Sequence, residues 1–120
     1  MDPQTTLKPL LGQTLVSVEG AHEGSNEIVF TPETEAKRWR MFHRRDCCEN
    51  VDVESVKGEL ENLLGSPVLS AAEEIESGDE NYGTFTRTTF TITTAKGTVK
   101  IVWLGQSNGY YSEGVDFQTC

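Results

Sequence analysis

The stretch TFTRTTFTITTAKGTVKIVWLGQ, residues 84–106, decides the fold because it describes two β-strands joined by a tight turn. Threonine, phenylalanine, isoleucine, valine and tryptophan dominate both arms, and these residue types favour strands. The tetrapeptide TAKG lies between the arms and supplies the turn. One face of this hairpin carries the apolar residues Phe90, Ile92, Val99, Ile101 and Trp103. The sequence therefore predicts an antiparallel sheet with an apolar face.

Shorter strands are predicted on both sides of the hairpin. Alternating or short apolar runs mark residues 15–20, 26–33, 36–44, 66–77 and 115–117. The second and third of these segments are expected to pair antiparallel, with one face packed and the other wet. The polar residues 78–83 are expected to form a loop.

A helical pattern interrupts the strands at DVESVKGELENLLG, residues 52–65. Asp52 is a good N-cap, and Gly65 followed by Pro67 would end the helix. The apolar residues recur at helical spacing and would form one stripe: Val53, Val56, Leu60, Leu63 and Leu64. The sequence thus predicts an α+β fold, a mainly antiparallel sheet of about six strands with one helix packed on one face. Its length fits a single domain, 1–120.

Composition and charge narrow the class of protein. The net charge is −9, and residues 49–80 hold ten acidic residues against one lysine. Nonspecific nucleic-acid binding is therefore not expected, because phosphate would be repelled. No apolar run is long enough to span a membrane and no signal peptide is visible, so a cytoplasmic location is expected. Three cysteines make no disulfide framework, and reduced thiols are expected.

The stretch HRRDCCENVDV, residues 43–53, gathers residue types that carry chemistry. A metal site is disfavoured, because structural zinc cysteines lie two to four residues apart and adjacent cysteines on a strand face opposite ways. A cysteine nucleophile would need His43 as its base, yet His43 and Cys47 would lie about 13 Å apart on a regular strand. A Cys47–Cys48 disulfide is a rare arrangement. Each of these hypotheses stays open beside a purely architectural one.

The architectural hypothesis is the favoured one. One of Cys47 and Cys48 would face the core beneath the helix, and the other would face a neighbouring strand. Asp46 and Glu49 would accept backbone N–H groups at the junction between strand and helix, and His43 would donate to one of these carboxylates.

A second polar stretch, SNGYYSEG at residues 107–114, places two tyrosines beside an Asn108-Gly109 turn. Either one tyrosine packs inward while the other covers the sheet edge, or both belong to a recognition surface. Tyrosine suits recognition because it offers a wide contact area at a low entropic cost.

Two long motifs resemble a family of small uncharacterised proteins encoded by phages and bacteria. One is DCCENVDVESVKGELENLLGSPVLSAAEE and the other is KGTVKIVWLGQSNGYYSEGVDF. The resemblance covers nearly the whole chain, from about Leu10 onward. At position 114 the resemblance implies a serine, whereas this chain has Gly114. It implies no activity, substrate or cofactor, and a phage origin would favour a host-directed or counter-defence role.

These observations predict a small non-enzymatic binding protein, with no catalytic residue, metal or cofactor, acting through a protein–protein contact surface. The expected partner is a protein such as a host factor, met in the host cytoplasm if the protein is phage-encoded. The residues expected to form the surface are Asn108, Tyr110, Tyr111, Glu113, His43, Arg44 and Arg45. The first alternative is a small-ligand or nucleotide-binding protein or sponge, with a base on a tyrosine and phosphates on Arg44 or Arg45. The second is a cysteine or metal-dependent enzyme.

Overall fold

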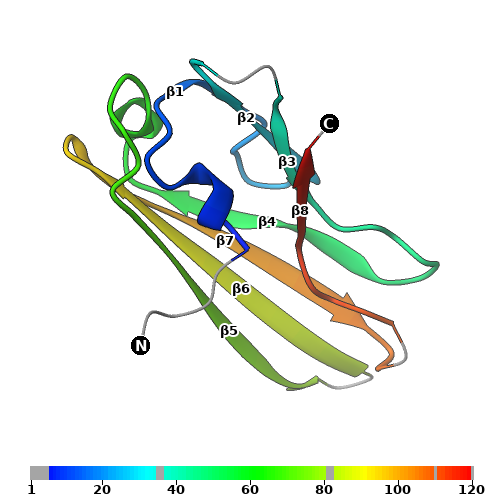
Figure 1. Cartoon of the computed structure of the whole chain (residues 1–120). Helices are drawn as coiled ribbons and strands as arrows, with labels where there is room; N and C mark the ends of the chain where they lie inside the picture. The colour runs from blue at the N-terminus through cyan, green and yellow to red at the C-terminus, as the bar shows by residue number, and fades with distance from the viewer. Residues whose placement is uncertain (1–5, 35–36, 81–82, 110, 120) are drawn as a thin grey trace.

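The computed structural model describes residues 6–34, 37–80, 83–109 and 111–119, which form two four-stranded antiparallel β-sheets (Figure 1). The sheet that we call the short sheet has the order β1 (Leu15–Glu19), β2 (Glu27–Pro32), β3 (Trp39–Phe42) and β8 (Asp116–Thr119). The sheet that we call the long sheet has the order β4 (Asn50–Lys57), β7 (Gly97–Ser107), β6 (Gly83–Thr94) and β5 (Ser70–Glu80). Two short 3-10 helices complete the fold, η1 (Lys8–Leu10) and η2 (Leu60–Leu63).

The predicted hairpin is confirmed and forms the centre of the long sheet. β6 and β7 pair without a break from Thr94 opposite Gly97 to Thr84 opposite Ser107. The five apolar residues predicted on its inner face are all fully buried. The strands predicted from residues 15–20, 26–33, 36–44, 66–77 and 115–117 are also present, and β2 pairs antiparallel with β3 as expected.

The expected α+β fold is wrong, because the described residues contain no α-helix and are nearly all β. The segment predicted as a helix forms β4 and then η2. A bulge between Val53 and Ser55 places Val53 opposite Trp103 and Val56 opposite Ile101, so a spacing of three residues keeps both valines on the core side. Leu60 and Leu63 of η2 follow Val56 at intervals of four and then three residues, so they continue the apolar pattern. The apolar stripe is therefore real, but a bulged strand and a 3-10 turn produce it.

Gly58 separates these two elements by a sharp change of direction. Its φ is +104°, in the region that side chains disfavour, and a Cβ there would lie 2.5 Å from the carbonyl oxygen of Thr98. A helix through this position would place Gly58 in its interior, whereas the chain uses it to end β4 close against β7. A second correction concerns residues 78–80, which continue β5 and do not form a loop; residues 81–82 lie outside the described part.

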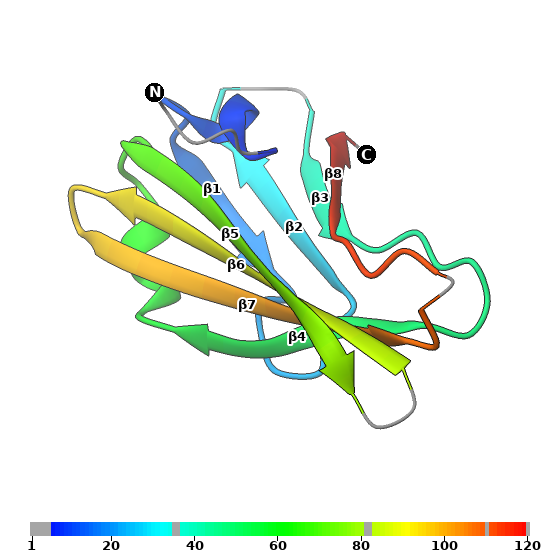
Figure 2. The same ribbon diagram turned by 90° about the horizontal axis from the view of Figure 1, so that it is seen from below.

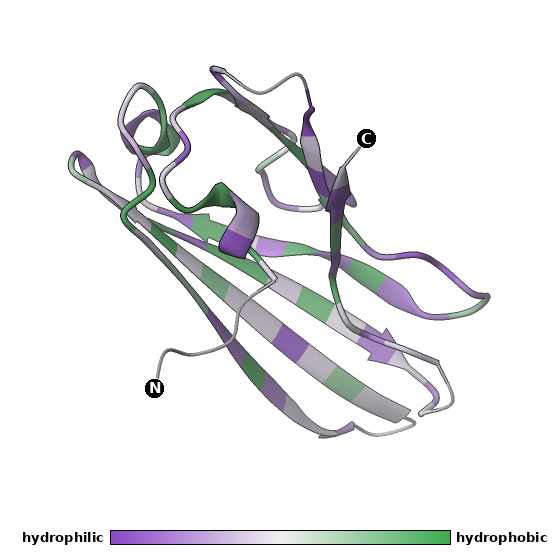
Figure 3. Cartoon of the chain, in the orientation of Figure 1, coloured by the Kyte–Doolittle hydropathy of each residue, from purple (hydrophilic) through white to green (hydrophobic). Residues whose placement is uncertain are grey.

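The core lies between the two sheets. Trp103 of β7 is fully buried, and its indole N–H donates to the sulfur of Met41 on β3 at 3.1 Å, which joins the sheets. In the short sheet, Phe117 of β8 stacks on Trp39 with ring centroids 5.1 Å apart and meets Phe30 edge-on at 6.0 Å. Figure 3 shows the alternation of polar and apolar residues along the long strands that gives this sheet one apolar face.

The two sheets differ in length. β5, β6 and β7 have 11, 12 and 11 residues, whereas the strands of the short sheet have between 4 and 6. At about 3.3 Å per residue, the long strands reach well beyond the sheet that packs on them. Figure 2 shows their far end projecting past β3 and β8. Other segments must cover the inner face there.

We expect Trp103→Ala to lower the free energy of unfolding by about 3–5 kcal/mol, because it opens a cavity between the sheets. Ile75→Ala is the control, since Ile75 is 65% exposed, and it should change stability by about 0.5 kcal/mol or less. Urea unfolding followed by far-UV circular dichroism measures both. Equal effects of the two substitutions would contradict this packing.

Candidate functional site

The loop between β3 and β4, residues 43–49, is organised around the carboxylate of Glu49. This side chain is buried, and its Oε1 accepts the backbone N–H of Cys47 at 2.9 Å. Its Oε2 accepts the N–H of Asp46 at 2.9 Å and the Nε2–H of His43 at 2.8 Å. The hydrogen bond from His43 and those from the backbone outweigh the effect of burial and lower the pKa of Glu49 to about 2. The carboxylate thus stays ionised and fixes the loop.

His43 links this loop to the segment that precedes β8. Its Nε2 faces Glu49, and its Nδ1 lies 2.7 Å from the carbonyl oxygen of Gly114. Both ring nitrogens are thus within hydrogen-bond distance of an oxygen atom, one from each of the two segments. The side chain is only 5% exposed. Both ring nitrogens are therefore occupied by contacts to Glu49 and Gly114, and neither of these contacts is with a cysteine.

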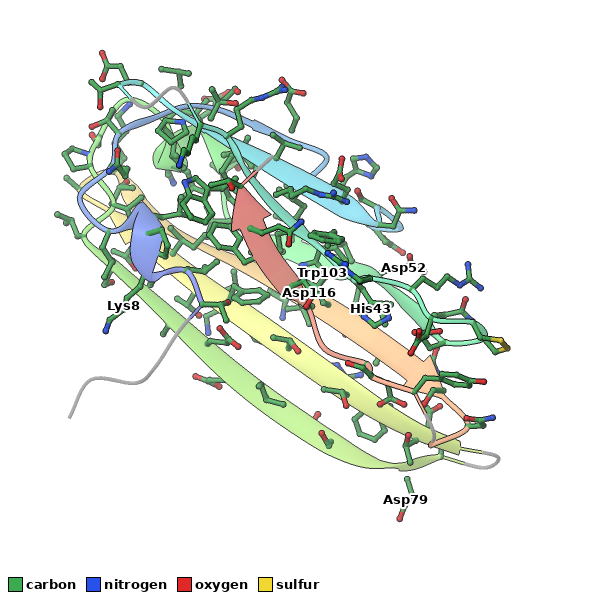
Figure 4. The ribbon with its side chains drawn as sticks, turned by 45° about the vertical axis from the view of Figure 1, so that its right-hand side comes forward. Lys8, His43, Asp52, Asp79, Trp103 and Asp116 are labelled. Carbon is green, nitrogen blue, oxygen red and sulfur yellow. A yellow bond between two sulfur atoms is a disulfide. The ribbon has the colours of Figure 1, made fainter. Side chains whose placement is uncertain are left out.

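A second contact joins the same two segments, because the backbone N–H of Arg44 donates to Oδ2 of Asp116 at 2.9 Å. Figure 4 shows His43 and Asp116 close together beside the β3–β4 loop. The pairing of Phe42 with Asp116 at the ends of β3 and β8 brings these segments side by side. The structure thus unites two stretches that the sequence separates by about 60 residues.

Glu113 lies inside the molecule. It is 8% exposed, and its carboxylate accepts hydroxyl hydrogen bonds from Thr84 at 2.6 Å, from Thr86 at 2.9 Å and from Ser107. Burial opposes its ionisation, but the three hydroxyls together lower its pKa below the usual value. Gly105 lies directly beneath it, since a Cβ there would be 2.8 Å from the Cβ of Glu113. Glu113 therefore fastens the segment before β8 onto the far end of the long sheet.

The residues expected to form a contact surface divide into two groups. His43 and Glu113 are buried and serve as supports. Arg44, Arg45 and Asn108 are exposed, and Tyr111 is partly exposed. Tyr110 lies outside the described residues. We call these four outward residues the end surface: Arg44, Arg45, Asn108 and Tyr111.

The predicted role of Glu49 is confirmed, because it accepts backbone N–H groups and a hydrogen bond from His43. The loop joins two strands, however, and no helix begins there. Cys47 and Cys48 are bonded to each other and both are exposed, so the expectations of reduced thiols and of one thiol facing the core are wrong. The disulfide lies at the tip of the loop (Figure 4).

A pocket of about 280 Å³ opens beside the loop, between the ends of β2, β3 and β4. Arg40 and Arg45 bring two guanidinium groups to its wall, and Glu27 and Asp52 bring two carboxylates. The guanidinium carbon of Arg40 lies 3.6 Å above the ring of Phe42. The buried Nε of Arg40 lies 3.0 Å from Oε2 of Glu27 as an ion pair, in an orientation that forms no hydrogen bond. The wall therefore carries both signs of charge.

Among the described residues, no group of three or more histidine, cysteine, aspartate or glutamate side chains is arranged to hold a metal ion. In the same part of the chain, none of the helices has the length and apolar character that crossing a membrane requires.

The fold and the site define a β-protein of two unequal antiparallel sheets, with a polar end surface supported by two buried carboxylates. The chain belongs to the family described as a domain of unknown function (DUF7448), whose model matches residues 8–117. No curated protein and no solved structure matches the chain.

We expect Glu49→Gln to lower the melting temperature by several degrees at neutral pH, because the loop loses its ionised acceptor. The folded pKa of Glu49 is lowered to about 2 from 4.5, so its contribution is complete above pH 4.5 and is lost as the pH falls towards 2. The stability difference between wild type and variant should shrink over that window. Unfolding measured at a series of pH values tests this, and Glu19→Gln, at an exposed carboxylate, is the control. A difference that does not depend on pH would contradict it.

Proposed function

We propose that this protein is a small non-enzymatic binding protein that contacts a protein partner through the end surface. The observation that carries the proposal is the convergence of residues 43–49 and 111–116 at one end of the long sheet. Buried supports hold the backbone there, while Arg44, Arg45 and Asn108 are exposed and Tyr111 is partly exposed. A surface fixed before binding loses less conformational entropy when a partner docks, which favours affinity.

The composition of the end surface suits a protein partner. Arginine and tyrosine are enriched among the residues that dominate binding energy at protein interfaces. Arg44 also places positive charge at one end of a chain whose net charge is −9, so a partner with an acidic patch would be oriented towards this end. The proposal of a phage-encoded protein with a host partner in the host cytoplasm rests on the resemblance of the two long motifs.

The contacts of His43 support binding over cysteine catalysis. A cysteine nucleophile needs a base with a free lone pair, and both nitrogens of His43 are engaged by acceptors. Cys47 and Cys48 are bonded to each other, so neither sulfur is a thiolate.

A small polar ligand is the second candidate, because the pocket beside the loop is lined by Arg40 and Arg45. Its aromatic wall is Phe42, and Arg40 covers that ring. Among the described residues, no tyrosine lines the pocket as a surface on which a base could stack. A ligand there would need a negative group for Arg45 and a donor for Asp52.

We expect the double variant Arg44→Glu with Tyr111→Ala to reduce partner capture about tenfold or more, while its melting temperature stays near that of the wild type. Affinity capture from host lysate with mass spectrometry identifies the partner, and binding to that purified partner gives the ratio. The control is Arg38→Glu with Val16→Ala, which makes a matched charge reversal and truncates an exposed apolar side chain elsewhere.

Equal capture by the double variant and the control would refute the end surface. Mass spectrometry of small molecules released when the purified protein is denatured tests the second candidate. A stoichiometric ligand whose binding is lost in Arg45→Ala would favour the pocket over a protein partner.

A further inference from the structure

The outer edge of the long sheet carries no paired strand in the described part of the chain, where the N-terminal segment contacts it from Thr6 to the side chain of Glu73 at 3.0 Å. β5 forms this edge and pairs only with β6 among the described residues, without a break from Ser70 opposite Thr93 to Glu80 opposite Gly83 (Figures 1 and 2). In an antiparallel pair, every second residue of an edge strand directs its N–H and C=O away from its neighbour. β5 therefore presents a regular row of backbone donors and acceptors that another strand could complete.

The other edges are short or covered. On β4, the N–H of Val53 donates to the carbonyl oxygen of Ser25 at 2.8 Å, and its carbonyl oxygen accepts the N–H of Gly24 at 2.9 Å. Both partners lie in the connection between β1 and β2. On β1, Leu15 accepts the N–H of Gly65 at 3.0 Å. β8 has only 4 residues. Open edges invite pairing with other chains, and proteins usually protect them with bulges, prolines or charged side chains, above all lysines. β5 contains no bulge, proline or lysine.

The side chains of β5 select the charge of a strand that pairs with it. The strand has no basic residue and carries five carboxylates: Glu73, Glu74, Glu76, Asp79 and Glu80. Ile75 lies between them and is 65% exposed. Side chains of neighbouring strands lie about 4.5–5.5 Å apart, so opposite charges stabilise the pair and like charges destabilise it. The edge is therefore complementary to a strand in which lysine or arginine alternates with apolar residues.

A shallow hollow on one face of β5 adds to the preference for a strand with basic side chains. It has a volume of about 200 Å³ and is lined by Glu74, Ile75, Glu76, Arg87 and Thr89. Arg87 is committed to Glu76 at 2.8 Å and to Glu54 at 3.0 Å, so it does not neutralise Glu74. A basic side chain of a docked strand would reach this hollow beside Glu74.

A second copy of the chain is a poorer occupant. A twofold antiparallel pairing centred on Ile75 would set Glu74 of each copy directly opposite Glu76 of the other. Like charges directly opposite each other destabilise a sheet.

From these observations we propose that β5 is a docking edge for an extended basic segment of a partner protein, which adds to the long sheet as a fifth strand. This site is separate from the end surface. Main-chain hydrogen bonds would supply the affinity, and alternating basic and apolar side chains would supply the specificity.

The test uses a fluorescein-labelled peptide of ten residues in which lysine and valine alternate. Fluorescence anisotropy should show binding that weakens about tenfold in Glu74→Lys with Asp79→Lys, because two attractive pairs become repulsive. Glu19→Lys with Glu33→Lys changes the net charge equally at distant exposed sites and should bind as the wild type does. Arg44→Glu with Tyr111→Ala should also bind normally, which separates this proposal from the end surface.

Strand addition is distinguished from simple charge attraction in two ways. A peptide of equal charge with proline at alternate valine positions should bind at least about tenfold more weakly, because proline removes backbone donors. Hydrogen exchange of the wild-type protein should show new protection of amides in residues 70–80 when the first peptide is bound.

Either of two results would overturn the proposal: equal binding of the proline peptide, or unchanged exchange along β5. Self-association of the protein through this edge, seen by analytical ultracentrifugation and abolished by the β5 variant, would assign the edge to a second copy instead. The peptide comparisons use the wild-type chain, so they decide the matter even if the β5 variant does not fold.

Discussion

The length mismatch between the two sheets is the constraint on which the rest of the structure depends. Strands of 11 and 12 residues must have their inner face covered, yet the opposing strands have 6 residues or fewer. Near the middle of the molecule, Trp103 and Met41 close the gap with apolar side chains. At the far end, polar segments complete the cover. Buried polar cover is stable only when its groups are hydrogen-bonded, and that need explains the two enclosed carboxylates.

Glu49 and Glu113 solve this problem in different ways. Glu49 gathers hydrogen bonds from two backbone N–H groups and from the ring of His43. Glu113 is held by the hydroxyls of Thr84, Thr86 and Ser107, and no cation reaches it among the contacts described. Each carboxylate is satisfied inside the protein and leaves the neighbouring backbone in one conformation. Rigid support of this kind is what a loop needs in order to present arginine and tyrosine to a partner.

The sequence predicts the parts of this fold that depend on local pattern. The β6–β7 hairpin is predictable because two strand-forming arms flank a short turn, and the hydrogen-bonding role of Glu49 follows from its place beside backbone N–H groups. The helix prediction fails because apolar residues recur every three or four positions without a helix. A bulge after Val53 and the turn at Gly58 produce this spacing in a strand followed by a 3-10 turn. From the sequence, Glu113 is expected on the exterior beside a turn, because two of its three hydroxyl partners, Thr84 and Thr86, lie 29 and 27 residues away in the chain. The alternating hydroxyls of Thr84 and Thr86 are the one signal in the sequence that the inner face is polar there. The meeting of residues 43–49 with residues 111–116 depends on β3 pairing with β8, a long-range choice that no local pattern specifies.

That same pairing has a consequence for biosynthesis. β3 and its loop leave the ribosome well before the segment that contains Gly114 and Asp116, which supplies the acceptors for His43 and Arg44. During translation, at about 5–20 residues per second, the nascent chain spends several seconds with the ring of His43 lacking one of its two acceptors. The arginines and the tyrosine are therefore assembled into one recognition unit only after residues 114–116 have been synthesised, and chains released before that point would expose the long sheet without displaying that unit.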